Sequence, residues 1–200
     1  MKNAVIVARQ RPGGINQGLS RINVEIWWQG IRGMVIEQIK KQIVTMLQYE
    51  DPPNYIFLHV SANNIGHSKI GHIRNQLKVT INWIHNKLPN AIIIPSQIFP
   101  RFCWRYTSNL IAMEKCRYRL NNSIASYVLR LGGRYMRYPE IKATDIFLQN
   151  DGVHLTNLEN EVLLNSVQGV LEMFIQEPSH GPTFQINLKG DLKCQCYHCV

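Results

Sequence analysis

The sequence predicts an α/β fold, a three-layer α/β/α sandwich built on a mainly parallel sheet. Short apolar runs typical of strands alternate along the chain with longer amphipathic segments typical of helices. One of these runs, residues 55–60, is almost uninterrupted, as expected for a strand that is buried on both faces of a parallel sheet. The 200 residues, 45% of them hydrophobic, suit a single domain with its own core.

The first element is ambiguous from its pattern. Residues 4–8 form an apolar run that is too short to distinguish a strand from the last turns of a helix, and Arg11-Pro12-Gly13-Gly14 ends it. Residues 23–28, rich in Val, Ile and Trp, predict a strand. Gln29-Gly30-Ile31-Arg32-Gly33 follows, where two glycines permit a sharp turn or the close approach of a ligand to the backbone.

Two helix and strand pairs follow in the middle of the chain. Residues 34–49 and 68–87 carry apolar side chains at helical spacing, so each predicts an amphipathic helix. The strand at 55–60 lies between them, and a further strand is predicted at 91–95. Asn63 comes just after residues 55–60, at the carboxyl end of a buried strand, where open α/β sheets bind their ligands.

The last third of the sequence predicts two more helices. Residues 97–110 form a long loop with four aromatic side chains, suited to one wall of a cleft. A helix at 112–131 is predicted to end at Gly132-Gly133, because glycine favours the left-handed backbone of a helix cap. A short strand at 134–138 and a final helix at 158–175 complete the alternation.

The chemically most distinctive stretch is Asp151-Gly152-Val153-His154-Leu155-Thr156. Thr156 and Glu159 have the spacing of a capping box, which predicts that a helix begins directly after it. An Asp this close can accept a hydrogen bond from one ring nitrogen of His154 and leave the other nitrogen free to take a proton from a nucleophile. The stretch therefore predicts a base and the group that orients it.

Two further donors are predicted at the same edge of the sheet. A backbone amide at Gly30 and the side-chain amide of Asn63 are the types of group that stabilise an oxyanion in acyl transfer. Each signal alone also fits a structural role, because Asn and Gly often form turns and an Asp near a His is often a structural hydrogen bond.

The chain is basic, with 22 Lys and Arg against 13 Asp and Glu and a net charge of +9. This charge fits a solvated basic face and also fits binding to nucleic acid. We favour the solvated face, since the densest basic cluster contains no recognisable nucleic-acid-binding motif. That cluster consists of Arg101, Arg105, Lys115, Arg117, Arg119, Arg130, Arg134 and Arg137.

The five cysteines argue against a disulfide framework, because the sequence shows neither a secretory signal nor an apolar run of about 20 residues that could span a membrane. We expect an intracellular, cytoplasmic protein. Cys103 and Cys116 are predicted to be buried or half-buried. Residues 1–176 are expected to form the domain, and residues 177–200 a loose tail. The tail holds a group too closely spaced for an ordinary zinc site: Cys194, Cys196, His198 and Cys199.

Taken in order, these motifs resemble the SGNH hydrolase superfamily of GDSL-type esterases and lipases. The resemblance covers about residues 4–176. It is closest to the SGNH-like domains found in vertebrate genomes, some of them linked to retroelements. Three stretches carry it: Trp27-Trp28-Gln29-Gly30, Phe57-Leu58-His59-Val60-Ser61-Ala62-Asn63-Asn64-Ile65-Gly66 and Asp151-Gly152-Val153-His154-Leu155-Thr156.

The resemblance implies a flavodoxin-like SGNH fold that acts on acyl esters without a metal or organic cofactor. By this resemblance Gly30 and Asn63 match the oxyanion-hole residues, and His154 matches the catalytic base, oriented by Asp151. Two positions depart from the family pattern, because Ser61 stands where the family usually has Gly and Asn64 where it usually has Asp.

The larger departure concerns the nucleophile. The family carries its catalytic Ser in a Gly-Asp-Ser-like turn directly after the first, central strand, and no Ser follows residues 4–8 here. Ser20 imitates the motif, but a strand follows it almost at once, so we interpret it as a loop residue. We favour the interpretation that residues 4–8 are the end of the following helix, which would leave the first strand and the nucleophile upstream of Met1.

These departures leave three functional hypotheses. The first is an esterase-like domain with little or no hydrolysis. The second is a non-catalytic module that binds nucleic acid or another ligand. The third is a truncated or decayed copy that folds poorly, because a missing central strand would leave its neighbours with unpaired edges.

Overall fold

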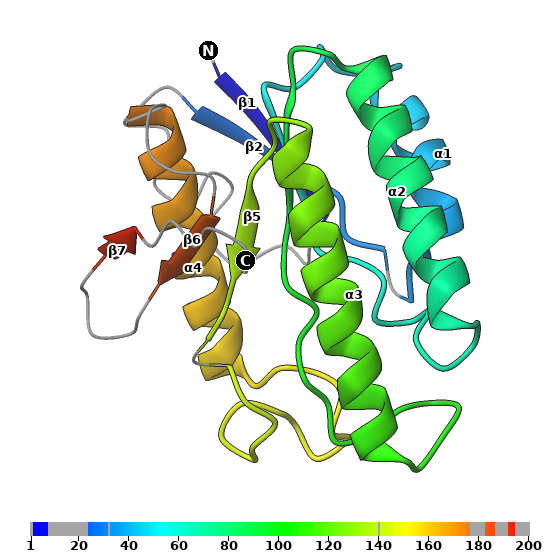
Figure 1. Ribbon diagram of the computed structural model, residues 1–200. Helices are drawn as coiled ribbons and strands as arrows, with labels where there is room; N and C mark the ends of the chain where they lie inside the picture. Colours follow the sequence, from blue (N-terminus) through cyan, green and yellow to red (C-terminus); the bar gives the residue numbers. More distant parts are fainter. Residues whose placement is uncertain are drawn as a thin grey trace.

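The alternating strands and helices are present in the computed structural model, which describes residues 2–7, 24–31, 33–139, 141–176, 183–186 and 192–194 (Figure 1). This alternation with parallel strands confirms the predicted fold class. The elements are β1 (Lys2–Val7), β2 (Val24–Trp28), α1 (Ile36–Met46), β3 (Tyr55–Leu58), α2 (Ile70–Lys87), β4 (Ile92–Pro95), α3 (Leu110–Arg130), β5 (Tyr135–Arg137), α4 (Asn157–Gln176), β6 (Thr183–Ile186) and β7 (Leu192–Cys194).

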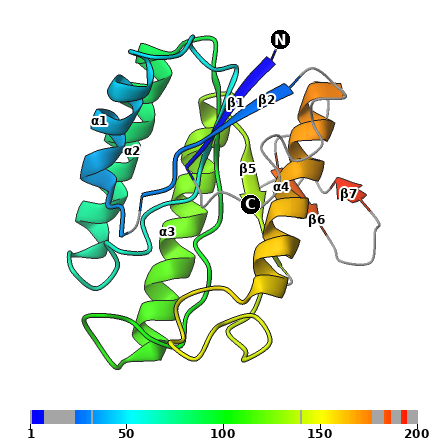
Figure 2. The ribbon, with the colours of Figure 1, turned by 180° about the vertical axis from the view of Figure 1, so that it is seen from behind.

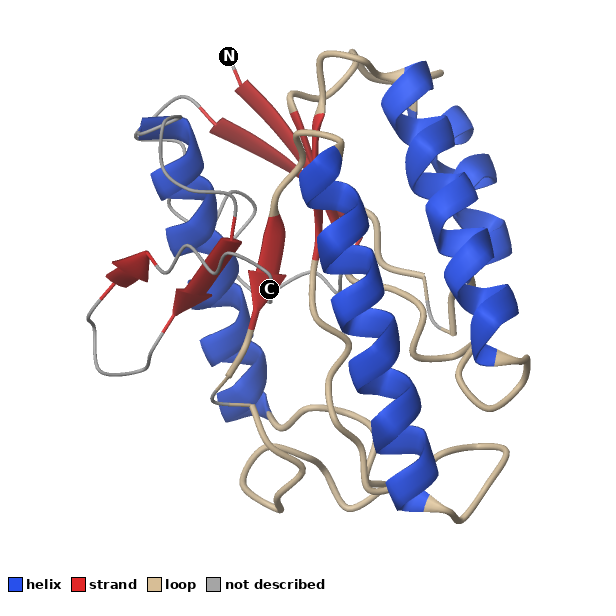
Figure 3. Ribbon diagram, viewed as in Figure 1, coloured by secondary structure: helices blue, strands red, loops and turns tan. Residues whose placement is uncertain are grey.

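The main sheet has the strand order β2-β1-β3-β4, with all neighbours parallel. Strand β5 runs beside β4, where the Arg134 amide donates to the Ile93 carbonyl at 2.9 Å and the Gln97 amide to the Met136 carbonyl at 2.8 Å. All five carboxyl ends therefore lie at one edge of the sheet, whose strands are drawn in red in Figure 3.

Strand β1 corrects the favoured interpretation of the N-terminus. Residues 2–7 are a strand, not the end of a helix, and Val5 lies opposite Trp27 of β2 on one side and Ile56 of β3 on the other. The central strand is therefore present. Its five-residue apolar run is shorter than two helical turns, so the local pattern could not reveal that both backbone edges have partners.

Helices cover both faces of the sheet (Figures 1 and 2). One core joins α1, α2 and α3 to the face of β3 that carries Ile56, and a second core joins α4 to the face that carries Phe57. Both side chains are almost fully buried because successive residues of a strand point to opposite faces. This explains why residues 55–58 read as a continuous apolar run.

The predicted end of α3 and the predicted burial of two cysteines can be compared with the structure. Helix α3 ends as predicted, with Gly132 at φ +75° and the Gly133 amide donating to the Val128 carbonyl at 3.0 Å. The prediction for Cys103 is wrong, because this thiol is exposed on an irregular loop, while Cys116 is half-buried on α3.

The segment beyond Pro178 contains two strands where the sequence predicts a loose tail. Strand β6 pairs in parallel with β5, and β7 pairs with β6 in the antiparallel direction. Both strands are short and their pairing with β5 is distant in sequence, so local periodicity did not indicate them. Cys194 ends β7, whereas the other members of the C-terminal group, Cys196, His198 and Cys199, lie outside the described residues.

Candidate active site

The loops that follow the parallel strands gather at the carboxyl edge of the sheet, in the lower part of Figure 1. Gly30 follows β2, Asn63 follows β3, and residues 97–110 connect β4 to α3. The loop with Asp151 and His154 leads from β5 into α4. The fold therefore brings every predicted site residue to the same edge.

Asp151 and His154 are in direct contact, as predicted. Oδ1 of Asp151 accepts hydrogen bonds from the backbone amides of Val153 and His154, both at 2.9 Å, and Oδ2 is hydrogen-bonded to Nδ1 of His154. These hydrogen bonds lower the pKa of Asp151, the bond from the His154 side chain most and the bonds from the two backbone amides less. The side chains are 46% and 55% exposed, so Nε2 of His154 remains open for a ligand or a proton.

The predicted capping box at the start of α4 is only half formed. Thr156 Oγ1 accepts from the Glu159 amide at 3.3 Å, but the Thr156 amide donates to the Phe147 carbonyl and not to Glu159. The Glu159 side chain is fully buried, and among the described residues neither of its oxygens has a hydrogen-bond partner. Burial raises its pKa to about 7. The carboxyl group lies on the same helix face as Leu163, which points to the core and not back to the cap.

The two predicted oxyanion donors differ in their surroundings. One Nδ2–H of Asn63 donates to the Met34 carbonyl at 3.0 Å, which ties the loop after β3 to the loop after β2. Its second Nδ2–H makes no hydrogen bond to the described residues, and Gly30 is exposed. A side-chain amide has two donor hydrogens, so Asn63 keeps one for a ligand.

The structure shows the surroundings of the two residues that depart from the resembled pattern. Ser61 is buried and has φ +86°, a left-handed conformation that glycine adopts more easily. Asn64 accepts from the Ile36 amide at 3.2 Å and so caps α1, while its Nδ2 donates to Glu37 Oε2 at 3.2 Å. An Asp at position 64 could cap the helix but could not donate to Glu37.

The loop of residues 97–110, predicted as one wall of a cleft, contacts both motif loops. The amides of Phe102 and Cys103 donate to the Gly152 carbonyl at 3.0 and 3.3 Å. Gly152 has φ +67°, and a Cβ atom there would lie 2.8 Å from Cβ of Phe102, so only glycine fits. On the other side, Tyr106 packs over Gly66, which follows the Asn63 motif.

The sequence did not reveal a pair formed by the half-buried His59 and the buried Ser96. Nδ1 of His59 lies 2.7 Å from Ser96 Oγ, and the centroid of its ring lies 4.4 Å from that of Phe99, with the two rings tilted by 38°. Burial, and secondarily the positive charge of Arg101, lowers the pKa of His59 to about 4. The imidazole is therefore neutral at pH 7, and Ser96 is only 6% exposed. The available signal was that each residue directly follows a buried strand.

The basic cluster does not form one surface. Arg117 is 2% exposed, forms an ion pair with Glu114 and donates to the Ile98 carbonyl at 2.7 Å. It is therefore a structural residue of the α3 interface. Arg119 and Arg130 are exposed on α3, and Arg101 lies near the site.

The search for ion sites and membrane segments covers only the part of the chain that the structure describes. No three His, Cys, Asp or Glu side chains in that part are grouped so that they could hold a metal ion. None of the helices there combines the length and apolar character needed to cross a bilayer.

The sequence and the fold were compared with those of known proteins. No family model matches the sequence, and no curated protein matches it. Solved structures do match. A lipase/acylhydrolase from Enterococcus faecalis has a TM-score of 0.61 and 15% identity, over 98% of this chain and 100% of its own.

Two further solved structures agree. The psychrotrophic esterase EstA from Pseudoalteromonas sp. has a TM-score of 0.61 and 12% identity, over 88% of this chain and 100% of its own. A GDSL-like lipase from Bacteroides thetaiotaomicron has a TM-score of 0.62 and 13% identity, over 86% of this chain and 88% of its own. At these identities the likeness establishes the fold, which is that of the GDSL and SGNH lipases, esterases and acylhydrolases.

Proposed function

We propose, from the SGNH hydrolase fold of the chain, that it is an esterase-like domain that binds an acyl ester and hydrolyses it slowly or not at all. The observation that carries the proposal is the hydrogen-bonded pair of Asp151 and His154 at the carboxyl edge of the sheet. The free Nδ2–H of Asn63 at the same edge supports it, because this donor suits the carbonyl oxygen of an ester.

Acyl transfer at this site would need a serine hydroxyl beside His154. The hydroxyl oxygen would attack the ester carbonyl, Nε2 of His154 would take its proton, and Asp151 would hold the ring by Nδ1. Asn63 and the Gly30 amide would donate to the oxygen that becomes negatively charged. The sequence has no serine between Val7, the end of β1, and Ser20, and Ser20 lies outside the described residues.

Ser96 is a poor substitute for this nucleophile. It is buried, and its partner His59 has a pKa of about 4, well below the value near neutral pH at which a general base works best. With no serine beside His154 among the described residues, we expect any hydrolysis at the site to use a water molecule activated by His154, without a covalent intermediate.

The test is the turnover of a small aryl acetate by the purified chain. We expect no hydrolysis above the buffer rate and the same result for His154→Ala. If the wild-type chain hydrolyses the aryl acetate and His154→Ala does not, the proposed loss of catalysis is refuted. Ester binding is tested separately, by NMR shifts of the Asn63 side-chain amide on addition of ethyl butanoate. The absence of any shift would refute the acyl-binding part.

The second candidate is a non-catalytic module that binds nucleic acid. The net charge of +9 supports it, as does the resemblance to retroelement-linked domains. Phosphate contacts are strongest at low ionic strength, so binding to single-stranded RNA should be detected at about 50 mM salt and weaken steeply as salt rises. No binding at that concentration would exclude this candidate.

A further inference from the structure

Arg101 lies beside the candidate site on the loop of residues 97–110. Two residues before it, the Phe99 ring packs at a tilt against the ring of His59, which follows β3. One residue after it, the Phe102 amide is bonded to the Gly152 carbonyl, between Asp151 and His154. The Arg101 guanidinium carbon is 5.7 Å from the ring centroid of Trp104, and the side chain is half-buried. Short contacts on both sides thus fix where this residue lies.

Among the residues that the structure describes, none accepts a hydrogen bond from the Arg101 guanidinium or forms an ion pair with it. Asp151 is close enough to attract its charge, but both carboxylate oxygens of Asp151 are already bonded to Val153 and His154. Guanidinium has five N–H donors and no acceptor, and partial burial without partners is unfavourable.

Near Arg101 there is more positive than negative charge. Burial lowers its pKa, the negative charge of Asp151 raises it, and the positive charge of Arg105 lowers it further. Arg105 is exposed on the same loop, so two cations face one carboxylate that is already occupied.

Arg117, which is buried and has a structural role, differs from Arg101 because its guanidinium has hydrogen-bond partners. Arg117 is bonded through its guanidinium to both oxygens of Glu114 and to the Ile98 carbonyl. A purely structural Arg101 would be expected to have some of these partners, because leaving a partly buried cation unpaired costs stability. Arg101 lacks them at the edge of the sheet where the fold binds ligands, so the missing acceptor is expected to come from a ligand.

We propose that Arg101, with Arg105 beside it, forms an oxyanion-binding subsite, so that the ligand of this site carries a carboxylate or phosphate group in addition to its acyl ester. The planar guanidinium can donate two parallel hydrogen bonds to such a group. The subsite deepens the proposed function and rests on it, since it defines the substrate class of the same site as acidic acyl esters.

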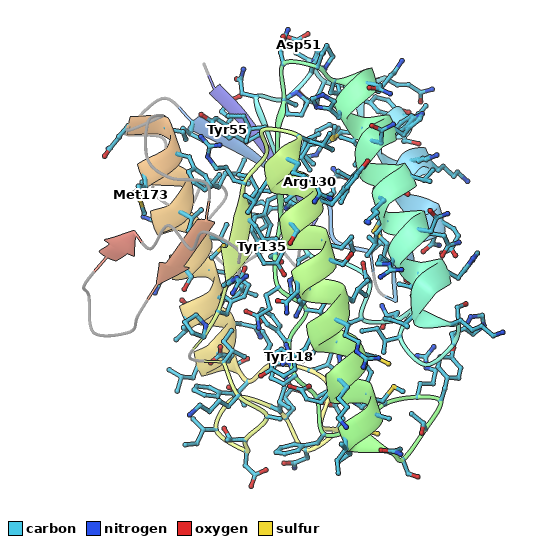
Figure 4. The ribbon with its side chains drawn as sticks, viewed as in Figure 1. Asp51, Tyr55, Tyr118, Arg130, Tyr135 and Met173 are labelled. Atoms are coloured by element: carbon cyan, nitrogen blue, oxygen red, sulfur yellow. The ribbon has the colours of Figure 1, made fainter. Side chains whose placement is uncertain are left out.

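The experiment compares three probes by NMR titration of the full chain. Monoethyl succinate carries an ester and a carboxylate, and ethyl butanoate is the same ester with a methyl group in place of the carboxylate. Inorganic phosphate carries the anion alone. The variants are Arg101→Gln, Arg101→Lys and, as a matched control that also removes one positive charge, Arg130→Gln. Arg130 is exposed near the end of α3 that lies away from the site loops (Figure 4).

We expect wild-type protein to bind monoethyl succinate about 10- to 100-fold more tightly than ethyl butanoate, as charge-assisted hydrogen bonds would give. Arg101→Gln should remove this difference and leave ethyl butanoate binding unchanged. Arg101→Lys should keep part of the affinity difference, because the lysine ammonium keeps the charge but cannot donate two parallel hydrogen bonds as the guanidinium does. Arg130→Gln should match the wild type.

Three results would overturn the subsite. They are equal affinities of wild-type protein for the two esters together with no Arg101-dependent binding of phosphate, an unchanged difference in Arg101→Gln, and an equal loss in Arg130→Gln. The first comparison needs no variant, so misfolding of Arg101→Gln cannot obscure it. If neither ester binds but Arg101-dependent phosphate binding remains, the proposed acyl-binding function fails and the oxyanion subsite stands. Phosphate binding without carboxylate binding would restrict the subsite to phosphate-bearing ligands.

Discussion

Replacing the buried Glu159 by Gln should stabilise the protein at neutral and alkaline pH and have little effect at acid pH. The carboxyl group is fully buried on α4 without a hydrogen-bond partner among the described residues, and burial raises its pKa from 4.5 to about 7. At about 1.4 kcal/mol per pKa unit, that difference corresponds to about 3 kcal/mol of unfolding free energy.

The sign follows from proton binding. The folded state holds the Glu159 proton more tightly than the unfolded state, so stability falls as the pH rises from about 4.5 to about 7. Below this window the carboxyl group is neutral in both states and costs nothing extra. Above it the charge is present in both states, and the folded protein bears the full cost of burying it. A neutral Gln avoids this cost at every pH.

The measurement is urea unfolding of the wild type and Glu159→Gln at pH 4.5 and pH 8. We expect the variant to be more stable by about 3 kcal/mol at pH 8 and nearly equal to the wild type at pH 4.5. Glu50→Gln, at an exposed position just after α1, is the matched control and should show no such pH-dependent gain. A stability difference between Glu159→Gln and the wild type that is the same at both pH values would refute the reasoning.

Three further predictions concern the loops at the carboxyl edge. Ser61→Gly should raise the unfolding free energy by up to about 1 kcal/mol, because glycine relieves the left-handed strain at φ +86°; destabilisation in urea would contradict this. Asn64→Asp should destabilise the protein by about 1–3 kcal/mol at pH 7, since it removes a buried donor and places a second carboxylate against Glu37; combining it with Glu37→Gln should recover most of the loss in the same unfolding assay. Ser96→Ala should cost about 1–2 kcal/mol through the lost bond to His59 and leave ester binding by NMR unchanged, and a loss of ester binding would give Ser96 a role at the site.

The fold was predictable where the pattern is long or strongly buried. Helix α1 has its apolar residues on one face, as predicted, and β3 is buried on both faces. Strand β1 could not be identified, because a run of a few apolar residues has no period of its own and its partners lie in β2 and β3. The same reason applies to β6, which depends on pairing with a distant strand.

The candidate site was predictable only where its residues are neighbours in sequence. The contact of Asp151 with His154 is local, so its geometry follows from the motif. The environment of Arg101 depends on contacts that cross the sheet edge, and the sequence showed only a member of a basic cluster. The sequence also could not distinguish buried from exposed members of the basic cluster. Arg117 is buried in an ion pair, whereas Arg119, two residues later, is exposed.

The central position of β1 has a consequence for synthesis on the ribosome. This strand is synthesised before both of its partners, and the β3 partner ends only at Leu58. At about 5–20 residues per second, the 51 residues between Val7 and Leu58 take roughly 3–10 s to translate. Strand β2 is made early in that time, but until β3 is complete the other edge of β1 has no partner within its sheet, so we expect nascent chains of this protein to depend on chaperones that bind short extended segments.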